Sequence, residues 1–289
     1  MGNCLVTKLK GSVSNNELLR LGEMRMRIAK VENPTDATQG FRMDVYKPVT
    51  LKIIGDGYFT DKTLVENKGK TITLNIGSNS VWVSNNDIKI AILDKYSMVS
   101  ISNVYIGQTS APYGRNRYLD LSDLKYSAAF NFLNLNNSQV TGDIANLKNL
   151  TALTSLKVFN TQIPLTGNIG DISTLTKCVE IQLKFSKLTG DLAKLPSVCK
   201  FASFSNDKGS VFTWSTRPSS AKIIAIEGNA SLTNIDKMLQ DQAQCQVGFS
   251  SNDPSYYKVI SVAGNRTSAS DDAVATLQQK GYTISITKA

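Results

Sequence analysis

The sequence predicts a mainly β fold with minor α content, in which an N-terminal antiparallel β module is followed by a short solenoid with helical C-terminal coils. Three observations support this prediction. Apolar residues alternate in several runs between residues 49 and 106, a short motif recurs between 133 and 195, and two helix-like segments lie near the C-terminus. Period-two alternation is typical of half-buried strands, and self-similarity at a fixed short period is typical of a solenoid.

The N-terminal module is expected to cover residues 1–112. Its alternating runs begin near residue 49, and clusters of Gly, Asn, Asp and Ser separate them. Short strands at this spacing predict a small antiparallel sandwich or barrel. Two further strands are expected at 5–10 and 24–29, with a short capped helix between them.

The recurring motif places an apolar-x-apolar strand core before a Thr-Gly-Asp or Thr-Gly-Asn turn. Glycine turns the chain where a side chain would obstruct it, and short polar residues bond the backbone of such turns. The first four intervals between successive strand cores lie within the roughly 20–29 residues of a leucine-rich repeat. The strand cores are expected to begin at Leu133, Leu156, Ile181, Ala202, Ile224 and Ile260.

The last coils depart from the motif because they contain helix-like segments. Residues 234–244 and 270–280 carry apolar residues at helical spacing, and the serine that opens the second segment is its expected cap. A strand-like run follows each helix, at 246–250 and 282–287. A solenoid needs a terminal coil that covers its open end, and residues 258–289 are expected to form it.

Strand positions that alternate with the apolar core are expected to face outward on the sheet side, where solenoid proteins commonly bind. Phe159 stands out among them, because an outward aromatic is a typical interface anchor. The opposing interpretation is that these are plain solvated strand residues. The candidate binding residues are Asn134, Asn136, Lys157, Phe159, Gln182, Lys184 and Ser203.

Catalytic chemistry has little support in the sequence. The chain contains no histidine, which removes the commonest general base and the commonest metal ligand. Asp143, Asp171 and Asp191 recur at similar places, but calcium needs roughly six to eight oxygens, so turn capping is the favoured interpretation. Trp82 is interpreted as a core residue, and Trp214 as either a core residue or a platform for a sugar ring. We therefore expect no catalytic residue, no metal and no cofactor, and carboxylate-pair glycosidase chemistry is the enzymatic alternative.

The net charge is +9, but the basic residues are scattered and form no stripe interleaved with aromatic residues. Nucleic-acid binding is therefore not expected. Arg20, Arg25 and Arg27 form the densest basic cluster and are candidate docking residues for an acidic protein surface. The sequence has no run of about 18 apolar residues and opens without an apolar signal segment, so neither membrane insertion nor Sec export is expected.

Two cysteines, Cys178 and Cys199, each precede an expected strand core and occupy equivalent positions in adjacent coils. Buried free thiols that pack as small apolar groups are the favoured interpretation. A disulfide between adjacent coils is the alternative. No C-x-x-C pair indicates a zinc or redox site.

The Leu-x-Leu, Leu-Thr-Gly-Asp-Leu and Gly-Asn elements resemble the leucine-rich repeats of proteins from gut Bacteroidetes and from phages that infect them. The resemblance covers about residues 130–289. Residues 4–11 and 18–23 look like the N-terminal module of structural proteins in crAss-like phages. This resemblance implies a virion protein, as a head fibre or tail fibre component, that is assembled in the host cytoplasm and anchored by its N-terminal module. The short, asymmetric array departs from the long horseshoes known for ligand binding, which puts a deep concave pocket in doubt.

Three function classes follow from these observations. The first is a non-enzymatic virion structural protein that docks by residues 1–112 and displays a repeat domain at 113–289. The second is a bacterial surface adhesin or binding module with the same repeats, and the third is a carbohydrate-active enzyme. The absent export signal favours the first class. Its expected partners are other virion proteins, further copies of the chain (a trimer in a fibre), and a host glycan or surface protein.

Overall fold

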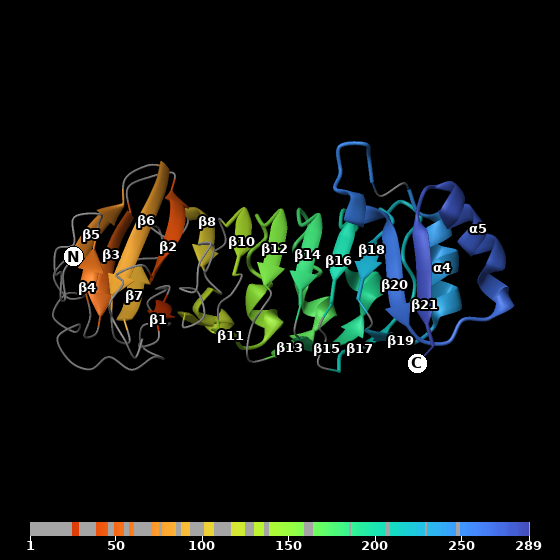
Figure 1. Ribbon diagram of the computed structural model, residues 1–289, viewed down its shortest axis with the longest axis horizontal. Helices are drawn as coiled ribbons and strands as arrows, with labels where there is room; N and C mark the ends of the chain where they lie inside the picture. The colour runs from red at the N-terminus through yellow and green to blue at the C-terminus, as the bar shows by residue number, and fades with distance from the viewer. Residues whose placement is uncertain are drawn as a thin grey trace.

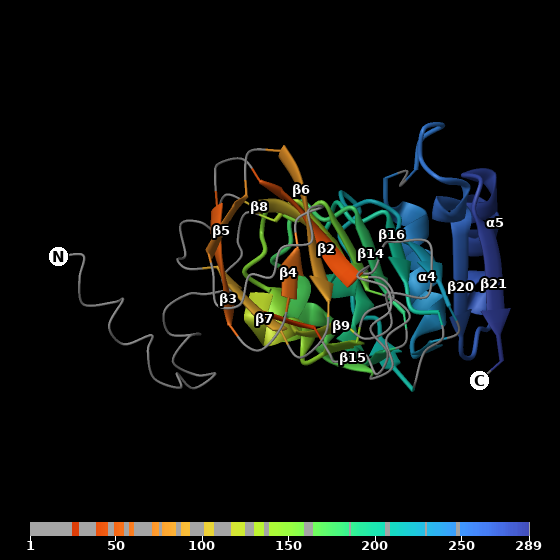
Figure 2. The same cartoon turned by 60° about the vertical axis from the view of Figure 1, so that its left-hand side comes forward.

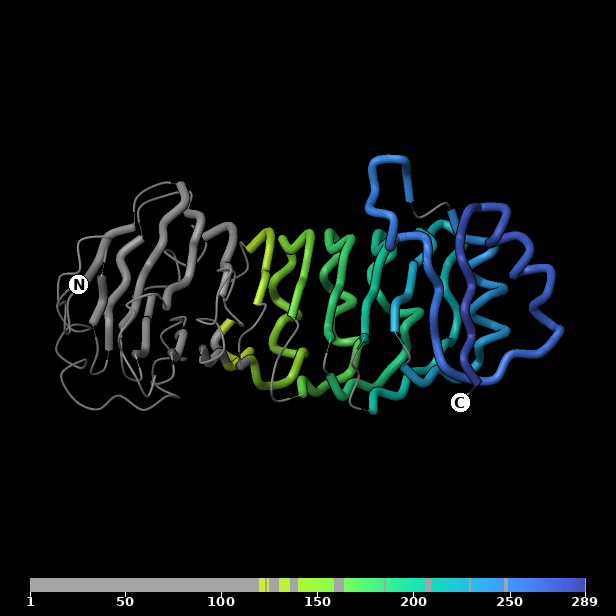
Figure 3. The backbone as a smooth tube through the Cα atoms, viewed as in Figure 1, coloured from red at the N-terminus to blue at the C-terminus, as the bar shows by residue number. Residues whose placement is uncertain are grey.

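In a computed structural model of the chain, the repeat region forms a stack of coils whose strands lie side by side (Figure 1). Figure 3 traces these coils as successive turns of one path. Between residues 25 and 106 the structure describes only the backbone of the strands. From there on it describes residues 117–124, 130–135, 139–158, 164–184, 186–205, 209–228, 230–246 and 249–288.

One strand from each coil enters a parallel front sheet, in the order β8-β10-β12-β14-β16-β18-β20 with β21 on the far side of β20. Each strand is short, because the chain must turn away at the same level in every coil. The bounds are β8 Ile101–Ile106, β10 Phe132–Asn134, β12 Ser155–Val158, β14 Glu180–Leu183, β16 Phe201–Ser203, β18 Ala225–Glu227, β20 Val259–Ala263 and β21 Thr283–Thr287.

A second row of strands follows the tight turns, and most of it forms the parallel run β13-β15-β17-β19. Its members are β9 Arg117–Asp120, β11 Gln139–Thr141, β13 Leu165–Asn168, β15 Ser186–Asp191, β17 Val211–Thr213 and β19 Ser231–Leu232.

Short helices, apart from η6 in the loop before β20, close the third side of the coils, and two α-helices stand beside β20 and β21 at the C-terminal end (Figure 2). The 3₁₀ helices are η2 Leu121–Leu124, η3 Ile144–Leu147, η4 Ile169–Ile172, η5 Leu192–Lys194, η6 Ser255–Lys258 and η7 Ser268–Ser270. The α-helices are α4 Ile235–Gln244 and α5 Asp271–Gln279.

Strands from the N-terminal part pair antiparallel with one another, and β2 also pairs antiparallel with β8 at the start of the front sheet. The runs expected between residues 49 and 106 coincide with strands, as does the run at 24–29. The division at 112/113 and the sandwich or barrel stay predictions. The strand expected at 5–10 and the Trp82 side chain lie outside the described residues. The strands are β1 Arg25–Ile28, β2 Gln39–Val45, β3 Val49–Ile54, β4 Tyr58–Thr60, β5 Thr71–Leu74, β6 Gly77–Ser84 and β7 Ile88–Ile92.

An apolar ladder runs through the coils beneath the front sheet. Leu133, Leu156, Ile181, Ile226 and Ile260 are each at most 1% exposed and belong to one core cluster. The strand register places each member opposite the next, with Ala202 between Ile181 and Ile226. This confirms the mainly β, leucine-rich-repeat-like solenoid that the repeating motif predicts.

The prediction that a strand core begins at Ile224 is wrong by two residues, because Ile226 pairs with Ala202. Residues 223–226 are all apolar and buried, so the sequence alone offers two registers. The side chain of Gln242, from α4, decides between them. It accepts a hydrogen bond from the backbone N–H of Ile224 at 2.8 Å and donates one to its carbonyl at 2.9 Å, which holds Ile224 outside the strand ladder.

The coil turns share a short polar residue that caps the following 3₁₀ helix. Side-chain oxygens of Asp143, Asn168 and Asp191 each accept a hydrogen bond from the backbone N–H two residues on, at 2.8–3.0 Å. Glycine precedes each of them with a positive φ, which is +126° at Gly167 and +113° at Gly190. A Cβ on Gly190 would lie 2.8 Å from Cγ of Asn168, so the bare glycine lets adjacent coils approach.

Turn capping is therefore confirmed for Asp143 and Asp191, but Asp171 is not their equivalent. It lies one turn later, within η4 and exposed, and Asn168 takes the capping position in that coil. Asp171 follows the capping position of its coil by three residues, as Asn146 follows Asp143.

Both C-terminal helices are confirmed, and each end lies within one residue of its predicted position. Ser270 stands at the N-cap of α5, but its hydroxyl does not cap the helix and donates to Asp236 at 2.6 Å instead. The strand expected at 282–287 is present as β21. The strand expected at 246–250 is absent from its described residues, where Gln246 makes only an isolated bridge to Lys222.

The described cysteines, Cys178, Cys199 and Cys245, are buried free thiols. The thiols of Cys178 and Cys199 donate to backbone carbonyls two residues on, at 3.2 and 3.4 Å. Burial raises the pKa of Cys178 and raises that of Cys199 to about 12, so both stay protonated. The favoured interpretation of these cysteines as small apolar groups is confirmed.

A comparison of two glycines tests the close approach of the coils. Gly190→Ala should lower the free energy of unfolding by about 2–4 kcal/mol, because it adds a clash with Asn168 to the cost of a positive φ. Gly209→Ala is the matched control: its φ is +97°, yet a Cβ there meets no atom within 4 Å. It should cost only about 1–2 kcal/mol. Urea denaturation measures both, and equal losses would contradict the packing role of Gly190.

Candidate interaction site

The outer face of the front sheet carries a row of polar side chains in strict register. Asn134, Lys157, Gln182, Ser203 and Glu227 stand opposite one another on β10, β12, β14, β16 and β18. Side chains alternate between the two faces of a strand, so the apolar ladder beneath the sheet forces these positions outward. We refer to this side of β10 to β18 as the outer face.

A second row on the outer face lies two residues earlier in each strand. It contains Phe132, Ser155, Glu180, Phe201 and Ala225. The row therefore places a single carboxylate, on β14, between a hydroxyl on one neighbouring strand and an aromatic ring on the other. Phe201 is only 1% exposed, although it points away from the core ladder.

Glu180 organises the centre of the outer face, where it is 6% exposed. One carboxylate oxygen accepts hydrogen bonds from Gln182 Nε2 at 2.6 Å and from the Tyr256 hydroxyl at 3.2 Å. The other accepts from Ser155 Oγ at 3.1 Å and forms an ion pair with Lys157 Nζ at 2.9 Å. Burying a carboxylate is costly unless it is paired and hydrogen-bonded, and here four donors from three segments of the chain satisfy it.

The loop that precedes β20 supplies the remaining partner. It rises beyond the ends of the strands in Figure 1 and carries η6. Tyr257 stacks on Phe201 with ring centroids 5.2 Å apart, and Tyr256 meets the same ring edge-on at 4.7 Å. An ion pair between Lys200 and Asp253 at 2.8 Å ties the loop to the coil below. These contacts explain why Phe201 is buried on the outer side of the sheet.

Tyr256 remains 39% exposed while its hydroxyl is held. Burial and the neighbouring Glu180 raise the pKa of Tyr256 to about 12, and they raise that of Tyr257 as well. The phenol of Tyr256 therefore stays protonated near neutral pH and donates to the carboxylate. The ring is fixed at both ends, by Phe201 and by Glu180, and presents one side to solvent.

Towards β18 the polar row continues as a smaller network. The hydroxyl of Ser203 donates to Glu227 at 2.8 Å, and Lys184 lies 3.6 Å from the same carboxylate. Lys157 also lies 5.8 Å above the ring of Phe132. The outer face thus alternates cationic, anionic and aromatic groups, each already engaged with a neighbour.

The structure brings five of the seven candidate binding residues onto this face. Asn134, Gln182 and Ser203 are at most 8% exposed, whereas Lys157 and Lys184 are partly exposed. Asn136, Phe159 and Arg20 lie outside the described residues. Arg25 and Arg27 are on β1, where only the backbone is described. The binding and docking roles of all these residues stay predictions.

Sequence reasoning missed Glu180 and Tyr256. Glu180 has the same strand parity as Gln182, so the alternation itself could have placed it on the outer face. Tyr256 is 76 residues from Glu180 in sequence, and no local pattern links them. The available signal was the unusually long interval before the last strand core, which holds the loop.

A buried polar cluster lies between the second row of strands and α4. Trp214 is 1% exposed, and its indole N–H donates to Asp241 at 2.9 Å, so it is a core residue and not a sugar platform. Arg217 is 3% exposed and donates to the carbonyls of Leu195 and Pro196 at 3.0 Å. Burial lowers the pKa of Arg217. The cluster joins coils and has no accessible surface for a ligand.

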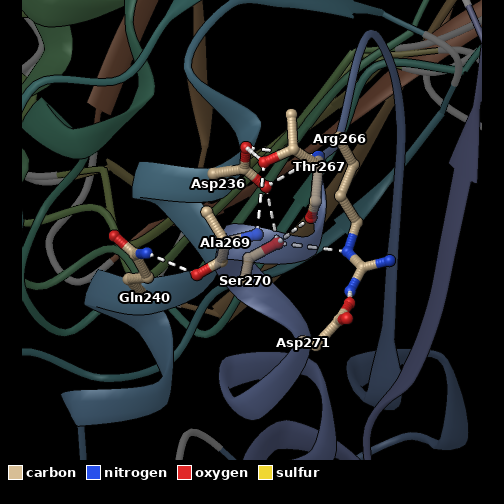
Figure 4. Close-up of polar contacts among 7 residues, drawn as sticks. All are labelled: Asp236, Gln240, Arg266, Thr267, Ala269, Ser270 and Asp271. Carbon is tan, nitrogen blue, oxygen red and sulfur yellow. Dashed lines mark hydrogen bonds and ion pairs between the residues drawn. The ribbon is translucent and has the colours of Figure 1, made fainter.

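A polar clamp joins α4 to the start of α5 (Figure 4). Asp236 accepts hydrogen bonds from Ser270 Oγ and Thr267 Oγ1, both at 2.6 Å, and from the backbone N–H of Thr267 at 3.0 Å. Gln240 donates to the carbonyl of Ala269 at 2.8 Å. These hydrogen bonds join α4 to the residues that precede α5, so the clamp fixes the terminal coil.

The described residues offer no metal site, since no three Cys, Asp or Glu side chains among them are grouped as ligands. In the same part of the chain, no helix has the length and apolar character needed to cross a bilayer.

Comparisons with known proteins add little. No protein-family model matches the sequence, and no curated protein matches it. Among solved structures, the chain is similar to the leucine-rich-repeat ectodomain of the plant membrane receptor kinase GASSHO1/SCHENGEN3 from Arabidopsis thaliana, solved in complex with CASPARIAN STRIP INTEGRITY FACTOR 2. The TM-score is 0.35 at 16% identity, over 60% of this chain and 20% of the receptor chain. The coils themselves, and not this match, define the repeat type.

Removing the central carboxylate should destabilise the protein. Glu180→Ala leaves Ser155 and Gln182 as buried donors without their acceptor, so we expect a loss of about 2–4 kcal/mol in the free energy of unfolding. Glu227→Ala, whose side chain is 42% exposed, is the matched control and should cost less than about 1 kcal/mol. Urea denaturation compares the two, and a loss at Glu180 no larger than at Glu227 would contradict the assigned role.

The hydrogen bonds to Asp236 should make the stability of the protein depend on pH. Hydrogen bonds from Ser270 and Thr267 lower the pKa of Asp236 below its ordinary value of 3.8. A lowered folded-state pKa adds stability above that ordinary value, and the contribution disappears as the pH falls through the folded-state pKa. Asp236→Asn should therefore lower the urea midpoint most at pH 6, and its effect should shrink towards pH 2.5 as the pH falls below 3.8. Gln240→Ala, which removes no titrating group, should have the same effect at both pH values.

Proposed function

We propose that this chain is a non-enzymatic binding protein that uses the outer face of its front sheet to hold another macromolecule. The proposal rests on the hydrogen bonds and the ion pair that surround the carboxylate of Glu180, which we call the Glu180 network. One buried carboxylate fixes Lys157, Gln182 and Tyr256 side by side, although they come from two strands and a distant loop. Side chains that are ordered before binding lose little entropy on association, and this favours recognition.

Tyr256 is suited to be the anchor of this face. It is one of two large apolar side chains among the described residues that remain exposed, and it is held by Phe201 and Glu180. Tyrosine and tryptophan dominate binding energy at interfaces because they bury a large rigid surface and keep a polar group. Lys157, whose side chain is 20% exposed, supplies a charge beside it.

Catalysis by the outer face is disfavoured by the same network. Glycoside hydrolysis needs one carboxyl group as acid and a second as base or nucleophile, roughly 5–9.5 Å apart. Glu180 already accepts four interactions, including an ion pair with Lys157, so attack or proton transfer would require breaking the structure around it.

The biological setting that we propose rests on the resemblance described above. In this setting, the chain is a structural protein of a virus that infects Bacteroidetes. It is a component of the head fibre or tail fibre and is assembled in the host cytoplasm. The N-terminal part, with Arg20, Arg25 and Arg27, docks onto other virion proteins. The repeat coils display the outer face towards a host glycan or surface protein, and further copies of the chain complete the fibre.

Purified particles test this proposal in two steps. Mass spectrometry should find the chain in particles of the virus that encodes it, and deletion of residues 1–47 should remove it. Tyr256→Ala should leave it in the particles but slow their adsorption to host cells about fivefold or more, because an interface anchor contributes at least ~1 kcal/mol. Val211→Ala, at the other exposed apolar side chain, is the matched control and should adsorb normally.

Two results would contradict the proposal. Absence of the chain from purified particles would refute the virion setting. Unchanged adsorption of the Tyr256→Ala particles, with the chain present at normal amounts, would refute the use of the outer face.

A further inference from the structure

Among the residues that the structure describes, the front sheet ends at β21. Among the described strands, β21 pairs only with β20, in a parallel register that places Ile284 opposite Ile260. An edge strand presents a row of backbone N–H and C=O groups that can pair with another chain. Natural proteins protect such edges with lysine, proline or a bulge inside the strand. The sequence of β21, Thr-Ile-Ser-Ile-Thr, contains neither residue, and its pairing with β20 is unbroken.

The backbone groups that face this edge can be assigned. The carbonyl of Thr287 accepts a hydrogen bond from the N–H of Gly264 at 2.8 Å, so its backbone points towards β20. Backbone groups of successive strand residues point to opposite sides. Those of Thr283 and Ser285 therefore also point towards β20, and those of Ile284 and Ile286 point to the open edge.

The residue order of β21 is the same in both directions around Ser285. A two-fold interface brings one surface against its own copy, so it requires a self-complementary surface. When two copies of this strand run antiparallel about Ser285, each Ile284 stands opposite Ile286 of the other copy. Each Thr283 likewise stands opposite Thr287. Like residues thus meet like residues along the whole strand.

We propose that β21 binds β21 of a second copy of this chain, antiparallel and around a two-fold axis at Ser285. In an antiparallel pair, hydrogen-bonded and non-hydrogen-bonded pairs alternate. The outward backbone groups of Ile284 and Ile286 form the hydrogen-bonded pairs, and Ser285 faces its own copy in a non-hydrogen-bonded pair. The residue order therefore selects this register, and the backbone assignment is compatible with it.

Side chains on both faces of β21 suit this partner. Ile284 and Ile286 are half-buried against the core beside α5, so the contact continues the apolar ladder into the second copy. Thr283, Ser285 and Thr287 are exposed on the other face. Threonine pairs directly opposite each other on adjacent strands add to sheet stability.

Sedimentation equilibrium on the full chain tests the contact. The wild type should show a reversible dimer of about 63 kDa, twice the chain mass of 31.5 kDa. Ser285→Lys places two like charges opposite each other on the axis and should weaken dimerisation about fivefold or more. Ser255→Lys, exposed on the loop before β20, is the matched control and should dimerise as the wild type does.

Cysteine cross-linking tests the register and does not depend on the lysine variant folding. The Cα atoms of a non-hydrogen-bonded antiparallel pair lie about 4.5 Å apart, within the range that a disulfide spans. Ser285→Cys should give a covalent dimer on mild oxidation. Thr283→Cys alone should not, but an equal mixture of Thr283→Cys and Thr287→Cys chains should.

Three outcomes would overturn the proposal. The first is a wild-type chain that stays monomeric at all concentrations. The second is an oligomer, of any size, that Ser285→Lys leaves unchanged. The third is a cross-linking pattern in which Ser285→Cys gives no more covalent dimer than Thr283→Cys.

Discussion

The in-register stacking of apolar residues is the constraint on which the other features of the repeat region depend. Leu156 must lie under Leu133, and Ile181 under Leu156, because each is buried by its neighbours along the ladder. A shift of one residue would turn every apolar side chain of a strand to the opposite face. The buried ladder therefore also sets the positions on the outer face. Glu180 meets Ser155 and Lys157 because Ile181 meets Leu156.

Adjacent coils stack closely at their turns because the glycine of one turn lies against the polar capping residue of the preceding coil. The Asn168 side chain holds its own 3₁₀ helix and fills the space that a Cβ on Gly190 would need. At the end of this series the cap Asp191 accepts a hydrogen bond from the backbone N–H of Ser215 at 3.1 Å, and Ser215 Oγ donates to it as well. Each turn is thus both a cap within one coil and a contact to the next.

Much of the repeat architecture could be predicted from the sequence because it is local. The Leu-x-Leu and Thr-Gly-Asp elements indicate the coils, and helical spacing indicates α4 and α5. The errors have physical causes: four consecutive apolar residues hid the register of β18, and in one coil an asparagine, Asn168, takes the capping position expected for Asp171. The Glu180 network could not be predicted, because Tyr256 reaches it from a loop whose path depends on packing against Phe201.

One continuous apolar ladder joins the coils. Methyl–methyl nuclear Overhauser effects, measured on protein with labelled Ala, Ile and Leu methyl groups, test it most directly. A continuous ladder should give a consecutive chain of cross-peaks from Leu133 through Leu156, Ile181, Ala202 and Ile226 to Ile260. Missing cross-peaks between successive members, or cross-peaks that connect them in another order, would contradict it.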